Sequence, residues 1–307
     1  MPKMNVVRST TISADPATVY SKLNDFNHWP TWSPWLIMEP GVDVTISDDA
    51  KYYEWKGKRT GEGNMKITGE VENNHINYDL NFLKPWKSKA KVSFHLEQTG
   101  DSTEITWTMD SSLPFFMFWM KKMMEGFIGM DYERGLNLLK DYVEKGEVRS
   151  KLEFLGVQPF PGTDYVGIKT TCSMKDIGDK MSADFGQLES HIESLADVQV
   201  TGAYSIYHKW DLKKMEVNYT ACLGVNNHPD SLPAGMFNSS IPKTNIHVVR
   251  HVGAYDHIGG AWSAQITMQR GKEFASKHGI HPFERYHNKP GEVPDKELIA
   301  DICFAAK

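Results

Sequence analysis

The chain contains few cysteines, and none of them has metal-binding or redox spacing. Cys172, Cys222 and Cys303 are the only three in 307 residues, and no two form a CxxC pair. An odd number of widely separated cysteines argues against a disulfide scaffold and predicts a reducing compartment. The N-terminal segment also lacks the apolar core of a signal peptide, so we expect a cytoplasmic protein.

Neither half of the chain carries an excess of basic charge. Up to Arg149 there are 18 basic and 21 acidic residues, a balance of −3, and the remainder has 16 and 18, a balance of −2. Binding to a phosphate backbone requires a basic excess, so we expect no direct contact with nucleic acid. Charges also interrupt the apolar stretch that begins at Leu113 well before the ~20 residues of a membrane span, so we expect no membrane partner.

Familiar catalytic and metal-binding signatures are missing as well. The glycines of GKRTGEGN precede a strand pattern, whereas a phosphate loop requires the start of a helix, and no GxSxG sequence is present. His247 and His251 share a strand face, but at ~3.3 Å per residue they lie roughly 13 Å apart, too far to bind one ion. We therefore predict no metal and no cofactor, and the sequence leaves open whether the protein is an enzyme.

What the sequence does contain is a long amphipathic pattern from Leu113 to Glu147. Apolar residues recur there at helical spacing with charged residues between them, which predicts one long helix. Gly126, Gly129 and Gly135 interrupt it, and each glycine costs about 1 kcal/mol relative to alanine in a helix interior. Either close packing against a sheet or room for a bound molecule would offset that cost.

The region before this helix is rich in strand patterns. Val6–Ile12 predicts an opening strand, after which Asp15 is a plausible N-cap for a short helix that begins at Pro16. Alternating apolar residues then recur with short polar turns up to residue 109, which predicts an antiparallel sheet with one apolar face curved around the long helix. Lys87, Lys89 and Lys91 share the other face of one strand, where we interpret them as a solvated face that protects a sheet edge.

Four stretches in this half carry a resemblance to a known family. They are VRSTTISADPATVYSKLNDFNHWPTWSPW, GEGNMKITGEV, FLKPWKSKAKVSFHLEQTGDSTEITWTMDSS and GMDYERGLNLLKDYVE. Together they resemble the polyketide-cyclase/START-like (SRPBCC) superfamily. The resemblance implies a helix-grip domain over residues 1–148, in which a bent antiparallel sheet and a long C-terminal helix enclose a hydrophobic cavity. Members of that family bind lipids, polyketides and hormones, and only some are enzymes.

From Leu152 onward the pattern changes to a repeat of about 80 residues. Each copy predicts a strand, a helix and two further strands: 165–171, 177–195, 202–207 and 215–225, then 245–251, 255–268, 282–286 and 298–304. Tyr207 precedes Cys222 by 15 positions, and Tyr286 precedes Cys303 by 17. We therefore predict two related units that share one core, with a groove between them as a place for a ligand. The whole chain is then of the α+β class.

The motifs YTACLGV, VVRHVGAYDHIGGAW and FERYHNKPGEVPDKELIADICF carry a second resemblance. They are similar to the GyrI-like effector-binding domain of AraC-type and MerR-type transcription regulators, over residues 152–307. The resemblance implies that Glu284 lies in an aromatic pocket for varied, often cationic, ligands. It also implies aromatic companions for that glutamate: Tyr165, Tyr204, Tyr219, Tyr255 and Trp262. We therefore expect no DNA-binding module of the kind that those regulators carry, because the SRPBCC-like domain occupies its place ahead of this domain.

We therefore expect a cytoplasmic protein that binds or senses a small hydrophobic or aromatic molecule, including cationic ones. Any role in transcription regulation would run through an unknown protein partner. The alternative is a hydrolase or cyclase that acts on a small electrophile with Glu284 as general base, because desolvation raises the pKa of a carboxyl group. A few relatives are hydrolases that pair this glutamate with an aromatic hydroxyl, and both Tyr255 and Tyr219 are candidates for that partner.

Overall fold

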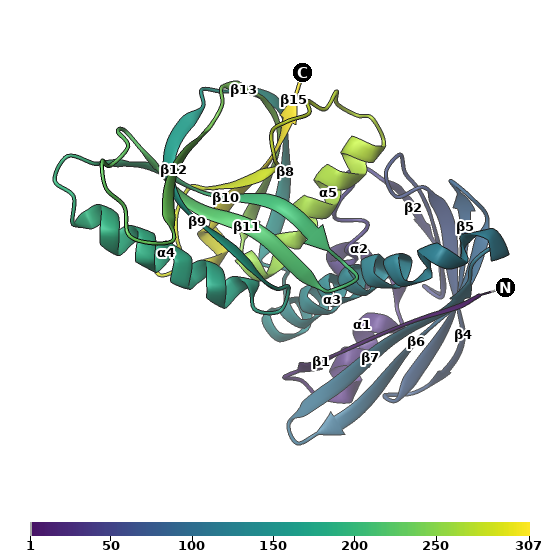
Figure 1. Ribbon diagram of the computed structural model, residues 1–307. Helices are drawn as coiled ribbons and strands as arrows, with labels where there is room; N and C mark the ends of the chain where they lie inside the picture. The colour runs from purple at the N-terminus through teal and green to yellow at the C-terminus, as the bar shows by residue number, and fades with distance from the viewer. Residues whose placement is uncertain (1) are drawn as a thin grey trace. The chain divides into compact units, whose positions relative to one another are not determined.

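The computed structural model describes residues 2–307, which divide into two compact units (Figure 1). The first unit ends at Lys151 and the second begins at Leu152. Each unit has its own antiparallel sheet with helices, so the α+β prediction is confirmed. Among the described residues, no helix has the length and apolar character needed to span a bilayer.

The N-terminal unit is built on a seven-stranded sheet in the order β1-β7-β6-β5-β4-β3-β2. Its elements are β1 (Lys3–Ile12), α1 (Pro16–Leu23), η1 (Phe26–His28), α2 (Trp29–Trp32), β2 (Asp43–Ile46), β3 (Tyr52–Lys56), β4 (Glu62–Val71), β5 (His75–Lys84), β6 (Ser88–Thr99), β7 (Ser102–Ser112), η2 (Phe115–Met120) and α3 (Lys121–Lys145). The long helix α3 follows the last strand and packs along β1, which is the predicted helix-grip arrangement.

Two local predictions in this unit have clear outcomes. Asp15 caps α1 as predicted, because its carboxylate accepts a hydrogen bond from the backbone N–H of Thr18 at 2.9 Å. Lys89 and Lys91 do lie on an exposed face of β6. Their interpretation as edge protection is wrong, however, because β6 pairs with β5 on one side and β7 on the other.

The predicted helix over 113–147 is two elements rather than one. A 3₁₀ segment, η2, precedes α3, and α3 ends at Lys145, where Gly146 caps it with a φ of 78° that suits glycine. Apolar residues at helical spacing stabilise an α-helix only when their face is buried. No side chain of η2 is buried, so the pattern overestimated the length of the helix.

Aromatic rings fill the interior between the sheet and α3. The ring of Trp107 stacks on that of Tyr132 from α3 with centroids 3.8 Å apart. Trp29, Trp32 and Phe94 are fully buried beside them, and their rings meet edge to face. The centre of this helix-grip domain is therefore a packed aromatic core.

The three glycines of α3 have different surroundings. A Cβ at Gly135 would lie 2.7 Å from the ring of Trp107 and 3.2 Å from the ring of Pro34. A Cβ at Gly129 would overlap the guanidinium of Arg8, which lies across the helix there. Nothing lies within 4 Å of a Cβ at Gly126. Close packing thus accounts for Gly135, whereas only the flexible end of Arg8 lies against Gly129 and open space lies beside Gly126.

These surroundings predict opposite effects for two alanine substitutions. Gly135→Ala should lower the free energy of unfolding by about 1–2 kcal/mol, because the methyl group overpacks the rigid ring of Trp107. Gly126→Ala should raise it by up to about 1 kcal/mol, because alanine is the better helix former and has room. Urea unfolding of both variants measures the difference, and equal effects would contradict the packing described here.

The C-terminal unit is an eight-stranded sheet in the order β12-β9-β11-β10-β14-β15-β13-β8. Its elements are β8 (Ser150–Phe160), β9 (Thr163–Ser173), α4 (Ile177–Glu193), β10 (Val200–Asp211), β11 (Glu216–Val225), β12 (Met236–Ile241), β13 (Thr244–Gly253), η3 (Tyr255–His257), α5 (Gly259–Arg270), β14 (Phe283–Tyr286), η4 (Asp295–Glu297) and β15 (Ile299–Ala306). The strands β8 and β12 were not predicted, and they flank the sheet on either side.

The strand order confirms the duplication. The first copy is β9-α4-β10-β11 and the second is β13-α5-β14-β15. In the sheet they are arranged symmetrically as β9-β11-β10 and β14-β15-β13, so the third element of each copy lies at the centre. The helix α4 packs on β9 and β11, and α5 packs on β13 and β15, as the symmetry requires. The two copies therefore meet along β10 and β14.

Candidate functional site

The seam between the two copies brings equivalent positions together. Ser205 of β10 pairs directly with Glu284 of β14, and these residues are 79 positions apart, close to the repeat length. Residues paired directly across two strands project from the same face of a sheet. A carboxyl group and a hydroxyl group therefore face the helices α4 and α5 at the centre of the unit.

The side chain of Glu284 is enclosed by aromatic residues. It is only 2% exposed. The indole Nε1 of Trp262, from α5, donates a hydrogen bond to its Oε1 at 2.5 Å, and the hydroxyl of Tyr286 donates to its Oε2. The ring of Tyr207 completes the enclosure, with its centroid 4.8 Å from that of Trp262. Three aromatic side chains thus form the walls around one acid.

Burial changes the ionisation of the whole group. Desolvation raises the pKa of Glu284, and the hydrogen bonds from Tyr286, Trp262 and Tyr207 only partly oppose it. Desolvation, together with the nearby charge of Glu284, also raises the pKa values of Tyr207 and Tyr286 well above their usual value. The tyrosines are therefore hydrogen-bond donors at neutral pH, and the site carries at most one negative charge.

A methionine of the first copy occupies the position that is equivalent to Trp262 in the second copy. Met181 of α4 is 81 positions before Trp262, and its sulfur lies 3.2 Å from the hydroxyl of Ser205 and 3.3 Å from that of Tyr286. The same hydroxyl of Tyr286 is 3.2 Å from Ser205 Oγ. A thioether of α4 thus lies on one side of the seam where an indole N–H of α5 lies on the other, so the two helices present different groups to it.

Four of the six predicted ligand-binding residues lie on this face of the sheet. Glu284 and Trp262 are in direct contact. The ring of Tyr255 is 5.6 Å from that of Tyr286, but its hydroxyl donates to the backbone carbonyl of Asn288. Tyr219 lies farther along the sheet, where its hydroxyl donates to Asp184 at 2.8 Å. Neither predicted hydroxyl partner therefore touches the carboxyl group.

The other two predicted residues lie on the opposite face. Tyr204 and Tyr165 belong to a hydrophobic cluster with Phe160 and Phe283. Tyr204 adjoins Ser205 in the strand, and successive side chains of a strand alternate between faces. The structure therefore separates these two tyrosines from Glu284, and their role in the predicted pocket is not supported by their position.

Tyr286 and Tyr207 also contact the acid, and neither is among the ligand-binding residues predicted from the sequence. Tyr286 is two residues after Glu284 in a strand, so the period of two already places their side chains on one face. Tyr207 has the equivalent position in the first copy. The alternation of side chains along a strand, taken together with the repeat, would therefore have identified both tyrosines from the sequence.

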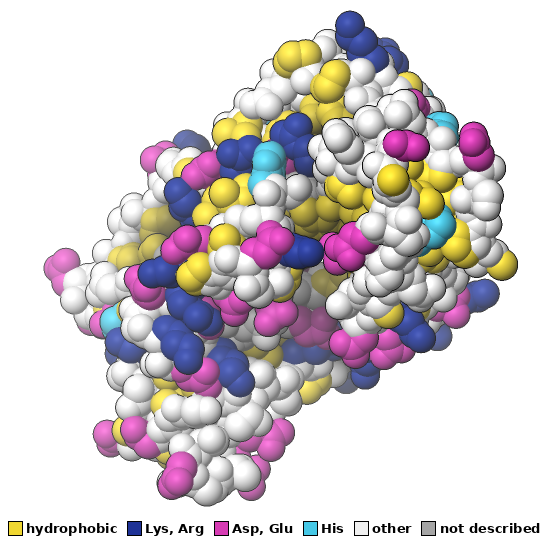
Figure 2. Space-filling model, turned by 90° about the vertical axis from the view of Figure 1, so that its left-hand side faces the viewer, with side chains coloured by type: hydrophobic (Ala, Val, Ile, Leu, Met, Phe, Trp, Pro, Cys, Tyr) yellow, Lys and Arg dark blue, Asp and Glu magenta, His cyan; other side chains and the backbone are white. Residues whose placement is uncertain are grey.

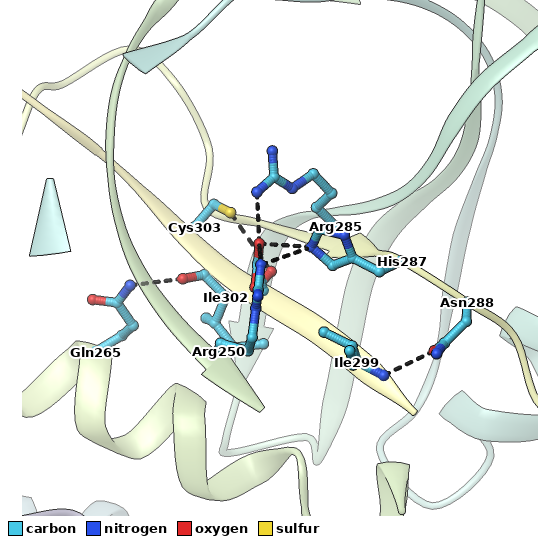
Figure 3. A network of polar contacts seen from close by, with 9 residues as sticks. Arg250, Gln265, Arg285, His287, Asn288, Ile299, Ile302 and Cys303 are labelled. Atoms are coloured by element: carbon cyan, nitrogen blue, oxygen red, sulfur yellow. Dashed lines mark hydrogen bonds and ion pairs between the residues drawn. The ribbon is translucent and has the colours of Figure 1, made fainter. Parts of the chain in front are cut away.

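The opposite face of β14 carries an ion network centred on Asp301 (Figure 3). Its carboxylate accepts hydrogen bonds from Arg250 Nε at 2.7 Å, Arg285 Nη2 at 2.6 Å and His287 Nε2 at 2.8 Å. Burial alone would raise the pKa of Asp301, but these three partners hold it well below its usual value. The network joins β13, β14 and β15, and so fixes the backbone that presents Glu284 and Tyr286.

The two histidines that share a predicted strand face, His247 and His251, each form a hydrogen bond within the domain. His247 is hydrogen-bonded to Gln265 at 2.8 Å, and the Nε2 of His251 contacts the carbonyl of Ala254 at 2.8 Å. Burial lowers the pKa of His251 to about 4, so it is neutral at physiological pH. Within residues 2–307, no three His, Cys, Asp or Glu side chains converge as metal ligands.

The surface view shows no block of one charge. On the face presented in Figure 2, lysine and arginine side chains are interspersed with aspartate and glutamate, and hydrophobic side chains lie between them. This mixture agrees with the near-balanced charge of the sequence.

Comparison with known families assigns the two units separately. Residues 3–144 match the family described as polyketide cyclase / dehydrase and lipid transport. Residues 157–307 match the GyrI-like small molecule binding domain. The chain is a fusion of these two domain families. Small-molecule binding is therefore the general function that its GyrI-like domain supports.

Solved structures similar to the chain have low sequence identity to it. The C-terminal domain of EcmrR is 18% identical and covers 52% of this chain and 98% of its own, with a TM-score of 0.41. The EcmrR–DNA complex is 16% identical, with 62% and 69% covered and a TM-score of 0.42. The Aha1 dimer from Colwellia psychrerythraea is 19% identical, with 47% and 98% covered and a TM-score of 0.35. No curated protein matches the chain.

The raised pKa of Glu284 predicts a pH-dependent gain in stability for Glu284→Gln. A folded-state pKa above the unfolded value means that stability falls as pH rises from the unfolded towards the folded value, so the buried acid costs stability at neutral pH. Glutamine removes this cost and should raise the free energy of unfolding by about 0.5–2 kcal/mol. The gain should shrink as the pH falls towards 4.

Urea unfolding at several pH values measures this effect. The exposed Glu193, the last residue of α4, supplies the control, because Glu193→Gln is a surface substitution that should change stability by at most about 0.5 kcal/mol. A Glu284→Gln variant that is less stable than wild type at neutral pH would contradict a destabilised buried acid.

Proposed function

We propose that the GyrI-like domain binds a small organic cation that carries an aromatic or other apolar group, with Glu284 as its counter-charge. The observation that carries the proposal is a single buried carboxyl group inside walls of Trp262, Tyr207 and Tyr286. A carboxylate attracts a cation, and aromatic faces add cation–π attraction of about 0.5–2 kcal/mol. Few other ligand types would stabilise an otherwise costly buried acid.

A cation can contact the Glu284 carboxyl group only if that group gives up a hydrogen bond that it now accepts. Trp262 and Tyr286 now donate to its two oxygens, so a bound cation would replace at least one of these hydrogen bonds. Tyr286 is the more exposed of the two residues, and it adjoins Tyr255. We therefore propose that Tyr286 moves aside to admit the ligand, and that its hydroxyl competes with the ligand for Glu284.

A matched pair of probes tests the charge requirement. Benzyltrimethylammonium and neopentylbenzene have the same shape, but only the first is charged. Wild type should bind the cation at least ~10-fold more tightly than the neutral probe, since a close charge pair with low solvent access is worth more than 1.4 kcal/mol. Titration monitored by tryptophan fluorescence measures both affinities. Binding of the cation should also weaken as falling pH protonates Glu284.

Three variants separate the contributions to this binding. Glu284→Gln should abolish the preference for the cation and leave binding of the neutral probe intact. Tyr286→Phe keeps the ring but removes the competing hydroxyl, so it should bind the cation more tightly than wild type. Glu193→Gln should behave as wild type. Equal affinity of wild type and Glu284→Gln for the cation would refute the proposed role of Glu284.

The alternative function is hydrolysis or cyclisation of a small electrophile with Glu284 as general base. The raised pKa of that residue favours it, and Tyr286 supplies a hydroxyl in direct contact with the carboxyl group. Incubation with styrene oxide, a strained electrophile, distinguishes the two functions. Turnover in wild type that disappears in Glu284→Gln supports the enzyme, whereas cation binding without turnover supports the binding protein.

We also propose, on the resemblance to effector-binding domains, that ligand binding is read by a protein partner that regulates transcription. Under this proposal the domains extend over residues 1–148 and 152–307, and the ligand is read in the second of them. Affinity capture with and without benzyltrimethylammonium tests the idea. A partner retained equally in both conditions would argue against a ligand-dependent role.

A further inference from the structure

One end of the N-terminal sheet exposes an unusual concentration of large apolar side chains. Four residues of η2 are 61–77% exposed: Phe115, Phe116, Phe118 and Trp119. The end of β5 adds Leu83, which is 44% exposed, and the turn that follows adds Trp86, which is 60% exposed. Soluble proteins seldom leave contiguous aromatic surface in water unless it contacts a partner.

The strand register brings these two segments to the same end of the sheet. Phe82 of β5 pairs with Ser88 of β6, so the turn at 83–87 closes that end. Ala90 of β6 pairs with Ser111 of β7, so the chain leaves β7 towards η2 at the same end. The hydroxyl of Ser111 also donates to the carbonyl of Lys89 at 2.8 Å. We call residues 83–87 and 114–122 the aromatic tip.

The charge of the aromatic tip has one sign. Its 5 + 9 = 14 residues read LKPWK and PFFMFWMKK, with four lysines and no acidic residue. Lys84 pairs with Glu62 at 2.8 Å and Lys121 with Glu125 at 3.7 Å. Among residues 2–307, Lys87 and Lys122 take part in no ion pair. Two cations that are not neutralised thus flank an exposed aromatic surface on a protein whose net charge is −5.

We propose that the aromatic tip docks on the surface of an anionic lipid bilayer. Tryptophan and phenylalanine favour the interface between headgroups and acyl chains, and lysines beside them attract anionic lipids over a Debye length. No helix in the described part of the chain crosses a membrane, so the contact is peripheral. This proposal departs from the expectation of no membrane partner, which considered spanning segments only. It is independent of Glu284.

Sedimentation of the full chain with vesicles tests the proposal. Wild type should bind vesicles of phosphatidylcholine containing phosphatidylglycerol and should bind pure phosphatidylcholine at least several-fold more weakly, with a further loss at high salt. Phe116→Ser with Trp119→Ser, and separately Lys87→Glu with Lys122→Glu, should each reduce binding at least ~10-fold. Thermal unfolding should be unchanged, because these side chains are exposed.

Matched controls come from the same sheet. Val71, at the other end of β4, is 51% exposed, and Lys66 is an exposed lysine of that strand. Val71→Ser and Lys66→Glu should bind vesicles as wild type does, and so should Glu284→Gln. Energy transfer from tryptophan to a dansyl-labelled lipid should fall in the variant Trp86→Phe with Trp119→Phe while sedimentation persists. Unchanged transfer would overturn the proposal, because the contact would then lie elsewhere.

Two other outcomes would also overturn it. If wild type ignores anionic vesicles and light scattering shows a dimer that the aromatic substitutions convert to a monomer, the aromatic tip joins two copies of the chain. If wild type ignores vesicles and is monomeric, the surface does not recognise lipid. In either case the proposed function of Glu284 is unaffected.

Discussion

The alternation of side chains along a four-residue strand is the constraint on which the C-terminal site depends. In β14, Glu284 and Tyr286 project towards the helices, whereas Phe283 and Arg285 project to the other face. A shift of the register by one residue would exchange the two sets. The acid would then enter a hydrophobic cluster, and Arg285 would lose Asp301. The ion network and the buried acid therefore stabilise the same register from opposite faces.

The duplication explains why Glu284 lies where the two copies meet and why a serine, not a second acid, is paired with it. Symmetry places Ser205 opposite Glu284, and Met181 where the other copy has Trp262. Had both copies kept a carboxyl group, two acids would meet at the centre, and mutual repulsion would leave at most one ionised. The divergence of the two copies thus creates a site with one charge and with different walls on its two sides.

Much of this architecture could be predicted from the sequence. Each copy of the repeat of about 80 residues shows the same succession of strand and helix periodicity, and this succession predicts the order of the elements. The resemblance of the residues around Glu284 to the GyrI-like domain identified the acid. Two features were beyond local patterns. Tyr165 resembles the other aromatic candidates in sequence, but the face it occupies depends on the register of β9 with β11. The helical spacing of Phe115–Met120 is real, yet that segment buries no side chain.

The two domains use aromatic residues in different ways. In the N-terminal domain the rings of Trp107, Tyr132 and Phe94 pack against one another and fill the interior. In the C-terminal domain the rings surround a group that is costly to bury. Aromatic packing in the first case stabilises the fold. In the second it raises the energy of an acid, and a ligand of opposite charge can lower that energy again.

The most direct test of this account is a crystal structure of the protein grown with benzyltrimethylammonium. The account predicts the ammonium group within contact distance of the Glu284 carboxylate and the ring of Trp262, with the Tyr286 hydroxyl displaced from the carboxyl group. A cation bound elsewhere, with the hydrogen bonds from Trp262 and Tyr286 to Glu284 intact, would contradict it.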